Sequence, residues 1–504
     1  MTNQREKRNE ASLPHSVFSA EWLRKVEGQA AQETGISLFT LMQRAAEAAF
    51  SLTQRTYPDA RHWLVLCGHG NNGGDGYEVA RLAKNAGLRV TLLAVENDKA
   101  LPEEAQQARQ GWLACGGRVG SSNAQWPEDA DVIIDGLLGT GLSCAPRAPY
   151  TTLIDAMNAA SAPVISLDIP SGLNAQTGQA AGRAVHANHT ISFIALKPGL
   201  LTGQSRDYVG SLHYDALGLD SWLRGHTALL QRLDATQIGQ WLSPRRPCSN
   251  KGEHGRLVVI GGDVGFAGAI RMASEAALRT GAGLVRVLTH KQHAGPLLTA
   301  RPELMVQELT AESLNEALEW ADVIVIGPGL GQKTWGKQAL ERVAKCDKPA
   351  LWDADALNLL AIAPEKRQNR VLTPHPGEAA RLLGCTVKEI ESDRLLSVRK
   401  LVDQYGGVVV LKGAGTLIAG EQGELAVADV GNAGMASGGM GDVLSGIIGG
   451  LLAQKLNVYD AACAGTVIHG AAADEIARRQ GTRGMLATDL LAVIAPLVNP
   501  DLKK

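Results

Sequence analysis

Short apolar runs rich in β-branched residues alternate with longer amphipathic stretches along most of this chain. The runs have the length of buried strands, and the stretches between them, such as 77–86 and 269–280, have helical spacing. This alternation predicts α/β domains built on parallel sheets. The expected strands are 63–67, 89–94, 132–135, 164–168 and 190–195 in the first half, and 256–260, 284–288, 323–326, 350–353, 370–373 and 407–412 in the second.

The segment between His226 and Lys251 has a different character. It contains the run Pro244-Arg245-Arg246-Pro247 and shows no strand pattern. We therefore place a domain boundary there, which predicts two domains, 1–228 and 235–504. A chain of 504 residues is long enough for two domains with large cores of their own. The two halves show no repeat of one another.

Composition excludes several classes of protein. The net charge of −2 and an aromatic content of 4% argue against nucleic acid or an anionic membrane as the partner. No apolar stretch reaches the length of a membrane span, and the first ten residues lack the apolar core of a signal peptide. The seven cysteines are scattered without zinc-site spacing, which favours a reducing cytoplasm.

A glycine-rich run follows the first expected strand. Residues 68–76 read GHGNNGGDG, and a helix is expected after them. A glycine turn between a strand and a helix exposes backbone N–H groups that bind phosphate. The spacing is not that of the dinucleotide fingerprint. The alternative is a tight strand–helix turn without a ligand.

Two more strands of the first half are expected to end in aspartate, at Asp135 and Asp168. Ligands of open α/β sheets bind beyond the carboxyl ends of the strands. Both side chains should therefore face the same crevice as the glycine run. A strand-end aspartate can also be a helix cap or a turn former, which is the alternative for each of them.

The second half has glycine-containing segments after most of its strands and, near its end, the run Ser437–Asp442. Glycines at a helix start leave N–H groups free to face the negative charge of a transferred phosphoryl group. Asp442, directly after them, could accept the proton of an attacking hydroxyl. Its alternative role is to cap a helix over 443–454. A hairpin turn is the alternative for Lys412–Thr416, and a structural histidine is the alternative for His375.

The strings GNNGGDG (70–76), DGLLGTGL (135–142) and LDIPSGL (167–173) resemble the epimerase domain of NAD(P)H-hydrate repair enzymes. The resemblance implies that a potassium ion is held by Asn72, Asp135 and Ser171. It implies that Asp168 contacts the hydrated nicotinamide, and we interpret Asp168 as the acid/base group for inversion at ring carbon 6. Lys197 is either its helper or a solvated loop lysine. The residues implied to cradle the substrate are Asn71, Asn72, Gly73, Gly74, Asp75, Gly139, Thr140, Gly141, Leu142, Ser143, Cys144 and Ala145.

The second half resembles the ribokinase-like fold and, more closely, the dehydratase domain of the same repair family. The motifs GGD, RPELMV, DADALN, TPHPGE, KGAGT and GGMGDVLSG occur in the family's order, with Met440 where relatives more often have threonine. The resemblance implies ADP as phosphoryl donor, Mg²⁺, and Asp442 as the base that activates the hydroxyl on ring carbon 6. It implies substrate contacts from Gly268, Gly329, His375 and Asp442, and nucleotide contacts from Lys412, Gly413, Ala414, Gly415, Thr416 and Gly441.

These patterns together predict a Rossmann-like three-layer epimerase domain followed by a ribokinase-like dehydratase domain. The expected substrates are the hydrates of NADH and NADPH (NADHX and NADPHX) with ADP, in a cytoplasmic homo-oligomer. One alternative is a ribokinase-like small-molecule kinase with an N-terminal nucleotide-sensing domain. Another makes the first half a ligand-sensing or protein-binding module without catalysis.

Overall fold

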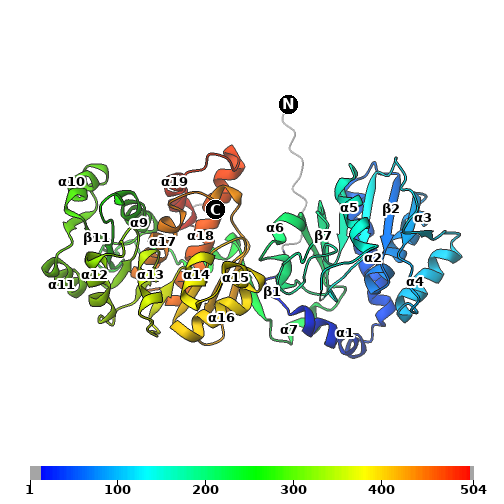
Figure 1. The fold of residues 1–504 in the computed structure, drawn as a ribbon, viewed down its shortest axis with the longest axis horizontal. Coiled ribbons are helices and arrows are strands. Elements are labelled where there is room, and N and C mark those ends of the chain that lie inside the picture. The colour runs from blue at the N-terminus through cyan, green and yellow to red at the C-terminus, as the bar shows by residue number, and fades with distance from the viewer. Residues whose placement is uncertain (1–12, 143, 500–504) are drawn as a thin grey trace. The chain divides into compact units, whose positions relative to one another are not determined.

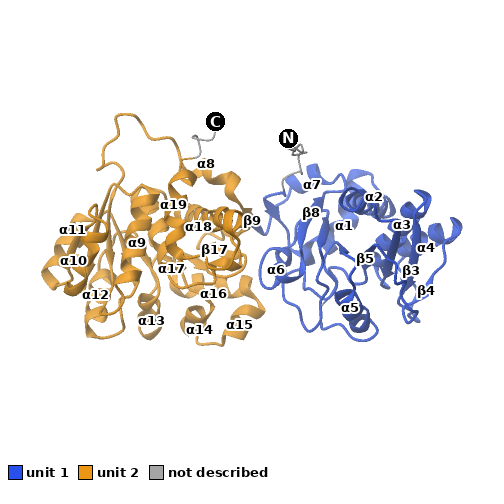
Figure 2. Cartoon of the chain, turned by 90° about the horizontal axis from the view of Figure 1, so that it is seen from above, with its two compact units in different colours: residues 1–231 blue, residues 232–504 orange. Residues whose placement is uncertain are grey.

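The computed structural model describes residues 13–142 and 144–499. The chain folds as two compact units, of which unit 1 ends at Gln231 and unit 2 begins at Arg232 (Figure 2). Each has its own sheet and hydrophobic cores (Figure 1). Within the described ranges, no helix is both long and apolar enough to cross a membrane.

Unit 1 is built on a parallel sheet whose strands lie in the order β4-β3-β2-β5-β6-β7-β8. A short strand β1 (Ser16–Val17) pairs antiparallel with Leu230 and Gln231 at the end of the unit. The five strands expected from the sequence are present. The bounds are β2 (His62–Cys67), β3 (Arg89–Ala94), β4 (Gly120–Ser121), β5 (Val132–Gly136), β6 (Val164–Leu167), β7 (His189–Phe193) and β8 (Ser211–Asp215).

Helices cover both faces of this sheet, as in a three-layer Rossmann-like domain. Within β2, Trp63, Val65 and Cys67 pack against α2, α3 and α4, while Leu64 and Leu66 pack against α5. Because both faces are covered, every residue of β2 is buried, as parallel strands require. The helices are α1 (Ala20–Thr34), α2 (Leu38–Thr56), α3 (Asn71–Asn85), α4 (Glu103–Ala114), α5 (Tyr150–Ala159), α6 (Ser205–Tyr208) and α7 (Asp220–Arg224).

The glycine run after β2 is not the loop expected from the sequence. The helix was expected to start at residue 77, but α3 begins at Asn71, with Gly70 as its N-cap, and winds residues 71–76 into its first turns. A Cβ atom at Gly73 would lie 2.1 Å from the carbonyl oxygen of Gly68. The glycines therefore let α3 start directly against the end of β2, and this packing outweighs their low helix propensity.

The strand order of unit 1 reverses between β2 and β5. From β2 the chain continues to β3 and β4 on one side, then returns to β5 on the other side of β2. Ligands of doubly wound folds bind at this switch point, beyond the carboxyl ends of the strands. The start of α3 and the segment after Asp135 both lie there.

Unit 2 has a larger mixed sheet, in which the order is β18-β17-β16-β15-β14-β13-β10-β11-β12. Its switch point lies between β10 and β13. The strand bounds are β10 (Arg256–Ile260), β11 (Leu284–Thr289), β12 (Met305–Glu308), β13 (Val323–Ile326), β14 (Ala350–Trp352), β15 (Arg370–Leu372), β16 (Val408–Leu411), β17 (Thr416–Gly420) and β18 (Leu425–Ala428).

Two expectations for the strands of this half are wrong. The sheet is not purely parallel, because β16, β17 and β18 pair antiparallel. The segment 226–251 also contains a strand, β9 (Leu230–Leu233), where the sequence pattern showed none. Within unit 2, the backbone N–H of Asp429 donates to the Leu233 carbonyl at 2.8 Å, so a long-range partner holds this short strand extended.

The core of unit 2 lies between its sheet and the helices α9, α17, α18 and α19. These four helices occupy neighbouring positions in Figure 1, and α17 is buried along most of its length. The helix bounds are α8 (Ile238–Trp241), α9 (Ala267–Thr280), α10 (Lys291–Ala300), α11 (Ala311–Trp320), α12 (Thr334–Ala344), α13 (Asp355–Ile362), α14 (Pro376–Leu383), α15 (Val387–Ser392), α16 (Arg394–Tyr405), α17 (Met440–Ala453), α18 (Val458–Gln480) and α19 (Ala487–Leu497).

Candidate active sites

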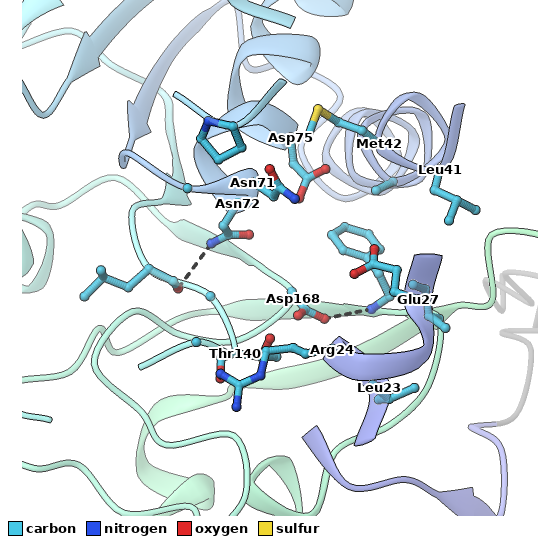
Figure 3. Close-up of a pocket in the computed structure, with 18 of the residues that line it drawn as sticks. Leu23, Arg24, Glu27, Leu41, Met42, Asn71, Asn72, Asp75, Thr140 and Asp168 are labelled. Atoms are coloured by element: carbon cyan, nitrogen blue, oxygen red, sulfur yellow. Dashed lines mark hydrogen bonds between the residues drawn. The ribbon is translucent and has the colours of Figure 1, made fainter. Parts of the chain in front are cut away.

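Unit 1 contains a cavity of 680 Å³ at its switch point (Figure 3). Its walls come from α1, α2, the start of α3, the segment after β5 and the ends of β6 and β7. The structure thus brings together most of the residues expected to hold the substrate. Those that line the cavity are Asn71, Asn72, Asp75, Gly139, Thr140, Gly141, Leu142, Cys144 and Asp168.

Gly73, Gly74 and Ala145 do not line this cavity. The two glycines are buried in the first turns of α3, where a Cβ atom at Gly74 would lie 2.5 Å from the Met42 side chain. Their contribution here is close packing of α3. Ser143 lies outside the described residues.

Asp168 follows β6 and is held firmly by its neighbours. Its backbone has a positive φ of 62°, which is uncommon and costly for a residue with a side chain. The backbone N–H of Phe193 donates to Asp168 Oδ1 at 3.1 Å, and the Lys197 ammonium donates to the same oxygen. Strain of this kind, fixed by surrounding contacts, is typical of a functional position.

Lys197 is buried, with 3% of its surface exposed, so the solvated-loop alternative is wrong. Besides Asp168, its ammonium donates to Phe193 O at 2.8 Å and to Ser192 Oγ at 3.2 Å. The buried Lys197 ammonium and the Asp168 carboxylate therefore form an ion pair with a fixed geometry. The pair fixes the orientation of the Asp168 side chain toward the cavity.

Sequence reasoning missed Glu27, which reaches the cavity from α1 (Figure 3). Burial, and next the charge of Asp168, raise the pKa of the Glu27 carboxyl. The same two causes raise the pKa of Asp75 well above its ordinary range. Glu27 lies one helical turn from the buried Leu23, so a carboxylate on the apolar face of α1 was the signal in the sequence.

Asn72, Asp135 and Ser171 meet around the backbone of Leu138. Asn72 Nδ2 donates to the Leu138 carbonyl at 3.2 Å, and the Leu138 N–H donates to Ser171 Oγ at 2.8 Å. Asp135, fully buried, accepts from Ser171 Oγ at 2.6 Å and from the Ser171 N–H at 2.9 Å. Asn72 Oδ1 is buried without a hydrogen-bond partner.

This oxygen set fits an alkali cation. An unpaired buried amide oxygen is costly, and a carboxylate, a hydroxyl and a carbonyl lie around the same peptide. Hard cations prefer such ligands, whereas transition metals take histidine or cysteine. Among the described residues there is no cluster of three or more histidine, cysteine or acidic side chains placed to hold a metal ion.

In unit 2, Asp442 lies in the first turn of α17, which begins at Met440, three residues earlier than expected. Gly439 is the N-cap and has a positive φ of 89°. No side chain caps this helix, so the capping alternative for Asp442 is wrong. The carboxyl is free to act on a group held at the helix start.

Asp442 belongs to a charged cluster around Lys412. The Lys412 ammonium lies 2.9 Å from Asp353 Oδ1 and 3.8 Å from Glu378 Oε2. Asp353 follows β14, is buried, and accepts from Ser445 Oγ of α17 at 2.8 Å. Burial, followed by the charge of Asp353, raises the pKa of Asp442 to about 7, and Lys412 opposes the rise. A carboxyl with this pKa can take and return a proton near neutral pH.

Asp353, Glu378 and Ser445 received no role from the sequence. A signal for Asp353 was available, because it ends a strand in the same way as Asp168. Ser445, one helical turn beyond Asp442, lies in a motif that was read for its glycines and its aspartate alone. Their connection through Lys412 depends on contacts between residues far apart in the chain.

The structural alternatives for His375 and for Lys412–Thr416, a structural histidine and a hairpin turn, both describe the local backbone correctly. His375 caps α14, since its Nδ1 accepts from the Gly377 N–H at 3.0 Å. Residues 412–415 join the antiparallel strands β16 and β17 as a hairpin connection. Neither structure prevents ligand binding, because half of the His375 side chain is exposed and the hairpin connection is exposed at Gly413 and Ala414.

Two of the glycines expected in the second site, Gly268 and Gly329, lie near its switch point, and the third, Gly441, lies beside Lys412. Gly329 follows β13, and a Cβ atom there would lie 2.5 Å from Phe266, just before α9. Gly268 is exposed in the first turn of α9. A Cβ atom at Gly441 would lie 3.2 Å from Lys412 Nζ, which places the start of α17 against the charged cluster.

Comparison with known proteins gives matches to both units. A family model described as NAD(P)H-hydrate dehydratase matches residues 257–496, and one described as YjeF-related protein N-terminus matches residues 38–199. A ribokinase-like superfamily protein from Enterococcus faecalis is 30% identical to this chain, with a TM-score of 0.50. The match covers 55% of this chain and 97% of that one.

Two full-length relatives carry the same description. The bifunctional NAD(P)H-hydrate repair enzyme of Escherichia coli is 64% identical over 99% of this chain and 97% of its own length. That of Vibrio cholerae is 45% identical over 97% of this chain and 99% of its own length. This chain belongs to the family of bifunctional NAD(P)H-hydrate repair enzymes.

Proposed function

We propose that unit 1 interconverts the R and S forms of NADHX and NADPHX at ring carbon 6, and that unit 2 converts the S form back to NADH or NADPH. The second reaction consumes ADP and gives AMP and phosphate. The observation that carries the proposal is that each unit places an aspartate beside a lysine ammonium that follows a strand of its sheet, Asp168 beside Lys197 after β7 and Asp442 beside Lys412 after β16. The family favours this pair of activities over a small-molecule kinase or a sensing module.

In unit 1, carbon 6 of the substrate bears both a hydroxyl and a ring nitrogen. Inversion at such a carbon needs a base to take a proton and an acid to give one. Asp168, oriented by Lys197 and by the Phe193 N–H, supplies the base. Asn71 and Thr140 both line the cavity, which supports a role for them in binding the dinucleotide.

A potassium ion would be held by Asn72, Asp135, Ser171 and the Leu138 carbonyl. It would supply a fixed positive charge beside the phosphates of the substrate. Asn72 Oδ1, buried and unpaired, is the atom that most needs such a partner. Binding of the ion would tie the start of α3 to the segment after β5, and so shape the wall of the cavity.

In unit 2, Asp442 removes the proton of the carbon 6 hydroxyl as that oxygen attacks the terminal phosphorus of ADP. The N–H groups at the start of α17 and the Lys412 ammonium face the negative charge of the transferred group. The phosphate on carbon 6 then leaves with its C–O bond electrons, and loss of a proton from the neighbouring carbon restores the dihydronicotinamide ring. His375, Gly268 and Gly329 contact the hydrate, and residues 412–416 with Gly441 contact the nucleotide.

Mg²⁺ would be held between ADP phosphates and one or two of the carboxylates Asp353, Glu378 and Asp442, where it would neutralise phosphate charge. This fits the cluster, because Mg²⁺ usually binds through few protein carboxylates and keeps several waters. A homo-oligomeric assembly and a location in the cytoplasm stay predictions, which light scattering and imaging of the tagged protein would check.

Each half-reaction has its own test. Purified R-NADHX is incubated with the enzyme without ADP, and the epimers are separated by chromatography; exchange faster than the spontaneous rate is expected, and is lost in D168N. Purified S-NADHX with ADP is followed by the absorbance of NADH, and this signal is lost in D442N. The proposal fails if the wild-type enzyme leaves both rates at their spontaneous values.

A further inference from the structure

Four carboxyls, one ammonium and one guanidinium line the cavity of unit 1. Arg24 and Glu27 come from α1, Asp75 from α3 and Asp168 from the segment after β6 (Figure 3), while Glu104 lies on α4 and Lys197 follows β7. Lys197 pairs with Asp168. Among the described residues, neither Glu27 nor Asp75 has a hydrogen-bond partner, although both side chains line the cavity.

The charges in this cavity do not balance if every carboxyl is ionised. Lys197 is paired with Asp168 and Arg24 donates to the Thr140 carbonyl, so no cation among the described residues pairs with the carboxyls of Glu27, Asp75 and Glu104, and an unpaired charge in a poorly solvated cavity is costly. Burial and the charge of Asp168 raise the pKa of both Glu27 and Asp75, which favours the protonated form of each. A carboxyl with a raised pKa close to a carboxylate that pairs with a lysine is a typical arrangement of a general acid and a general base.

The other charged groups near Glu27 do not reverse the upward shift of its pKa. Glu104 of α4 adds a negative charge, and Lys197 is the one cation that lowers the Glu27 pKa. Arg24, one turn earlier on α1, also lines the cavity, but its Nη1 donates to the Thr140 carbonyl at 3.1 Å and not to Glu27. Burial and Asp168 outweigh Lys197, so the Glu27 pKa is raised.

We propose that Glu27 is the general acid of the epimerisation and works opposite Asp168. This inference rests on the function proposed for unit 1. Asp168 takes the proton of the carbon 6 hydroxyl as the bond between carbon 6 and the ring nitrogen breaks. The oxygen becomes an aldehyde, and the bond electrons go to the nitrogen, which takes the proton of Glu27.

Rotation of the aldehyde by half a turn exposes its other face, and the same steps then run in reverse. The nitrogen attacks the carbonyl carbon and returns its proton to Glu27, while the oxygen recovers the proton from Asp168. Ring opening therefore needs no water, metal or redox partner, and the two carboxyls finish in the states in which they began.

Asp75 is the other carboxyl of the cavity whose pKa is raised, but it has a different position. It is on the same helix turn as Asn71 and Asn72, next to the segment expected to hold the dinucleotide. Glu27 stands on α1 and is seen beside Asp168 in Figure 3, where Asp75 lies near Asn71 and Met42. We assign Asp75 to substrate binding.

The test uses full-length enzyme and the variant E27Q, which keeps the shape of the side chain but has no acidic proton. The matched control is E21Q on the same helix, where Glu21 is exposed and pairs with Lys25. Epimer exchange is measured without ADP across pH. We expect kcat of E27Q to fall by about 10² to 10⁴-fold with KM changed by less than about threefold. E21Q should match the wild type.

The pH profile separates an acid from a structural residue. Wild-type kcat/KM should fall on the alkaline side as Glu27 loses its proton, and E27Q should lack this fall. Retained dehydration of S-NADHX with ADP shows that the variant is folded. Full epimerisation by E27Q, an alkaline limb that it keeps, or a wild-type profile without such a limb would each overturn the assignment. A wild type that does not epimerise at all would instead refute the function proposed for unit 1.

Discussion

Replacing Asp442 by asparagine should stop dehydration and, at the same time, stabilise unit 2. The amide has the shape of the carboxylate but cannot take the hydroxyl proton. Loss of a general base costs about 10² to 10⁴-fold in rate. Epimerisation should be unaffected, because Asp442 belongs to the other unit.

The gain in stability follows from the raised pKa. Burial and the nearby Asp353 raise the pKa of Asp442 from 3.8 to about 7. At 1.36 kcal/mol per unit, ionising Asp442 in the folded protein costs up to about 4 kcal/mol relative to the unfolded chain. The cost is absent below pH 4, grows as pH rises, and is complete above about pH 7. An asparagine at position 442 is never ionised, so D442N lacks this cost at every pH.

Thermal unfolding at several pH values measures this cost. The transition of unit 2 is the one that ADP raises, since a ligand stabilises only the fold that binds it. At pH 8, D442N should unfold on the order of 8 °C above the wild type, taking about 2 °C per kcal/mol for a domain of this size. The two proteins should converge toward pH 4. Equal transitions at pH 8, or a less stable variant, would refute the assigned pKa.

Three further predictions concern other parts of the two sites. Asp353→Asn removes a charge that raises the Asp442 pKa, so the midpoint of the dehydration pH profile should move about one unit or more to lower pH; an unchanged midpoint would contradict this. Asn72→Ala should weaken activation of epimerisation by K⁺ at least about tenfold, measured by titrating KCl against a constant ionic strength; an unchanged curve would exclude Asn72 as a ligand. Gly73→Ala should destabilise unit 1 by about 3 kcal/mol in urea unfolding, because its Cβ would clash with Gly68; a neutral effect would show that α3 can move.

Most strands of the two sheets could be predicted because buried parallel strands appear in the sequence as short apolar runs. Each expected strand lies within a residue or two of an observed one, since runs such as 257–260 are apolar throughout and are followed by glycine or aspartate. The start of α3 could not be predicted in this way. Glycine is a poor helix former, and what overrides that preference is the close approach of α3 to Gly68.

Other features depend on partners distant in sequence. The strand β9 is held by a hydrogen bond to Asp429, and no local pattern announces it. The environment of Asp442 is set by Asp353 and Lys412, which come from two other strand ends. The role of Glu27 could not be predicted for the same reason, since α1 and the end of β6 are far apart in the sequence and meet only in the folded unit.

The central claim is that one chain carries both reactions, with a base of its own for each. The direct measurement is the yield of NADH from a mixture of R- and S-NADHX with excess ADP, for the wild type, D168N and D442N. The wild type should recover both epimers in one fast phase. D168N should recover the S fraction quickly and the R fraction only at the spontaneous rate, and D442N should recover neither. A wild type that stops at the S fraction, or a D168N enzyme that recovers both epimers quickly, would contradict the account.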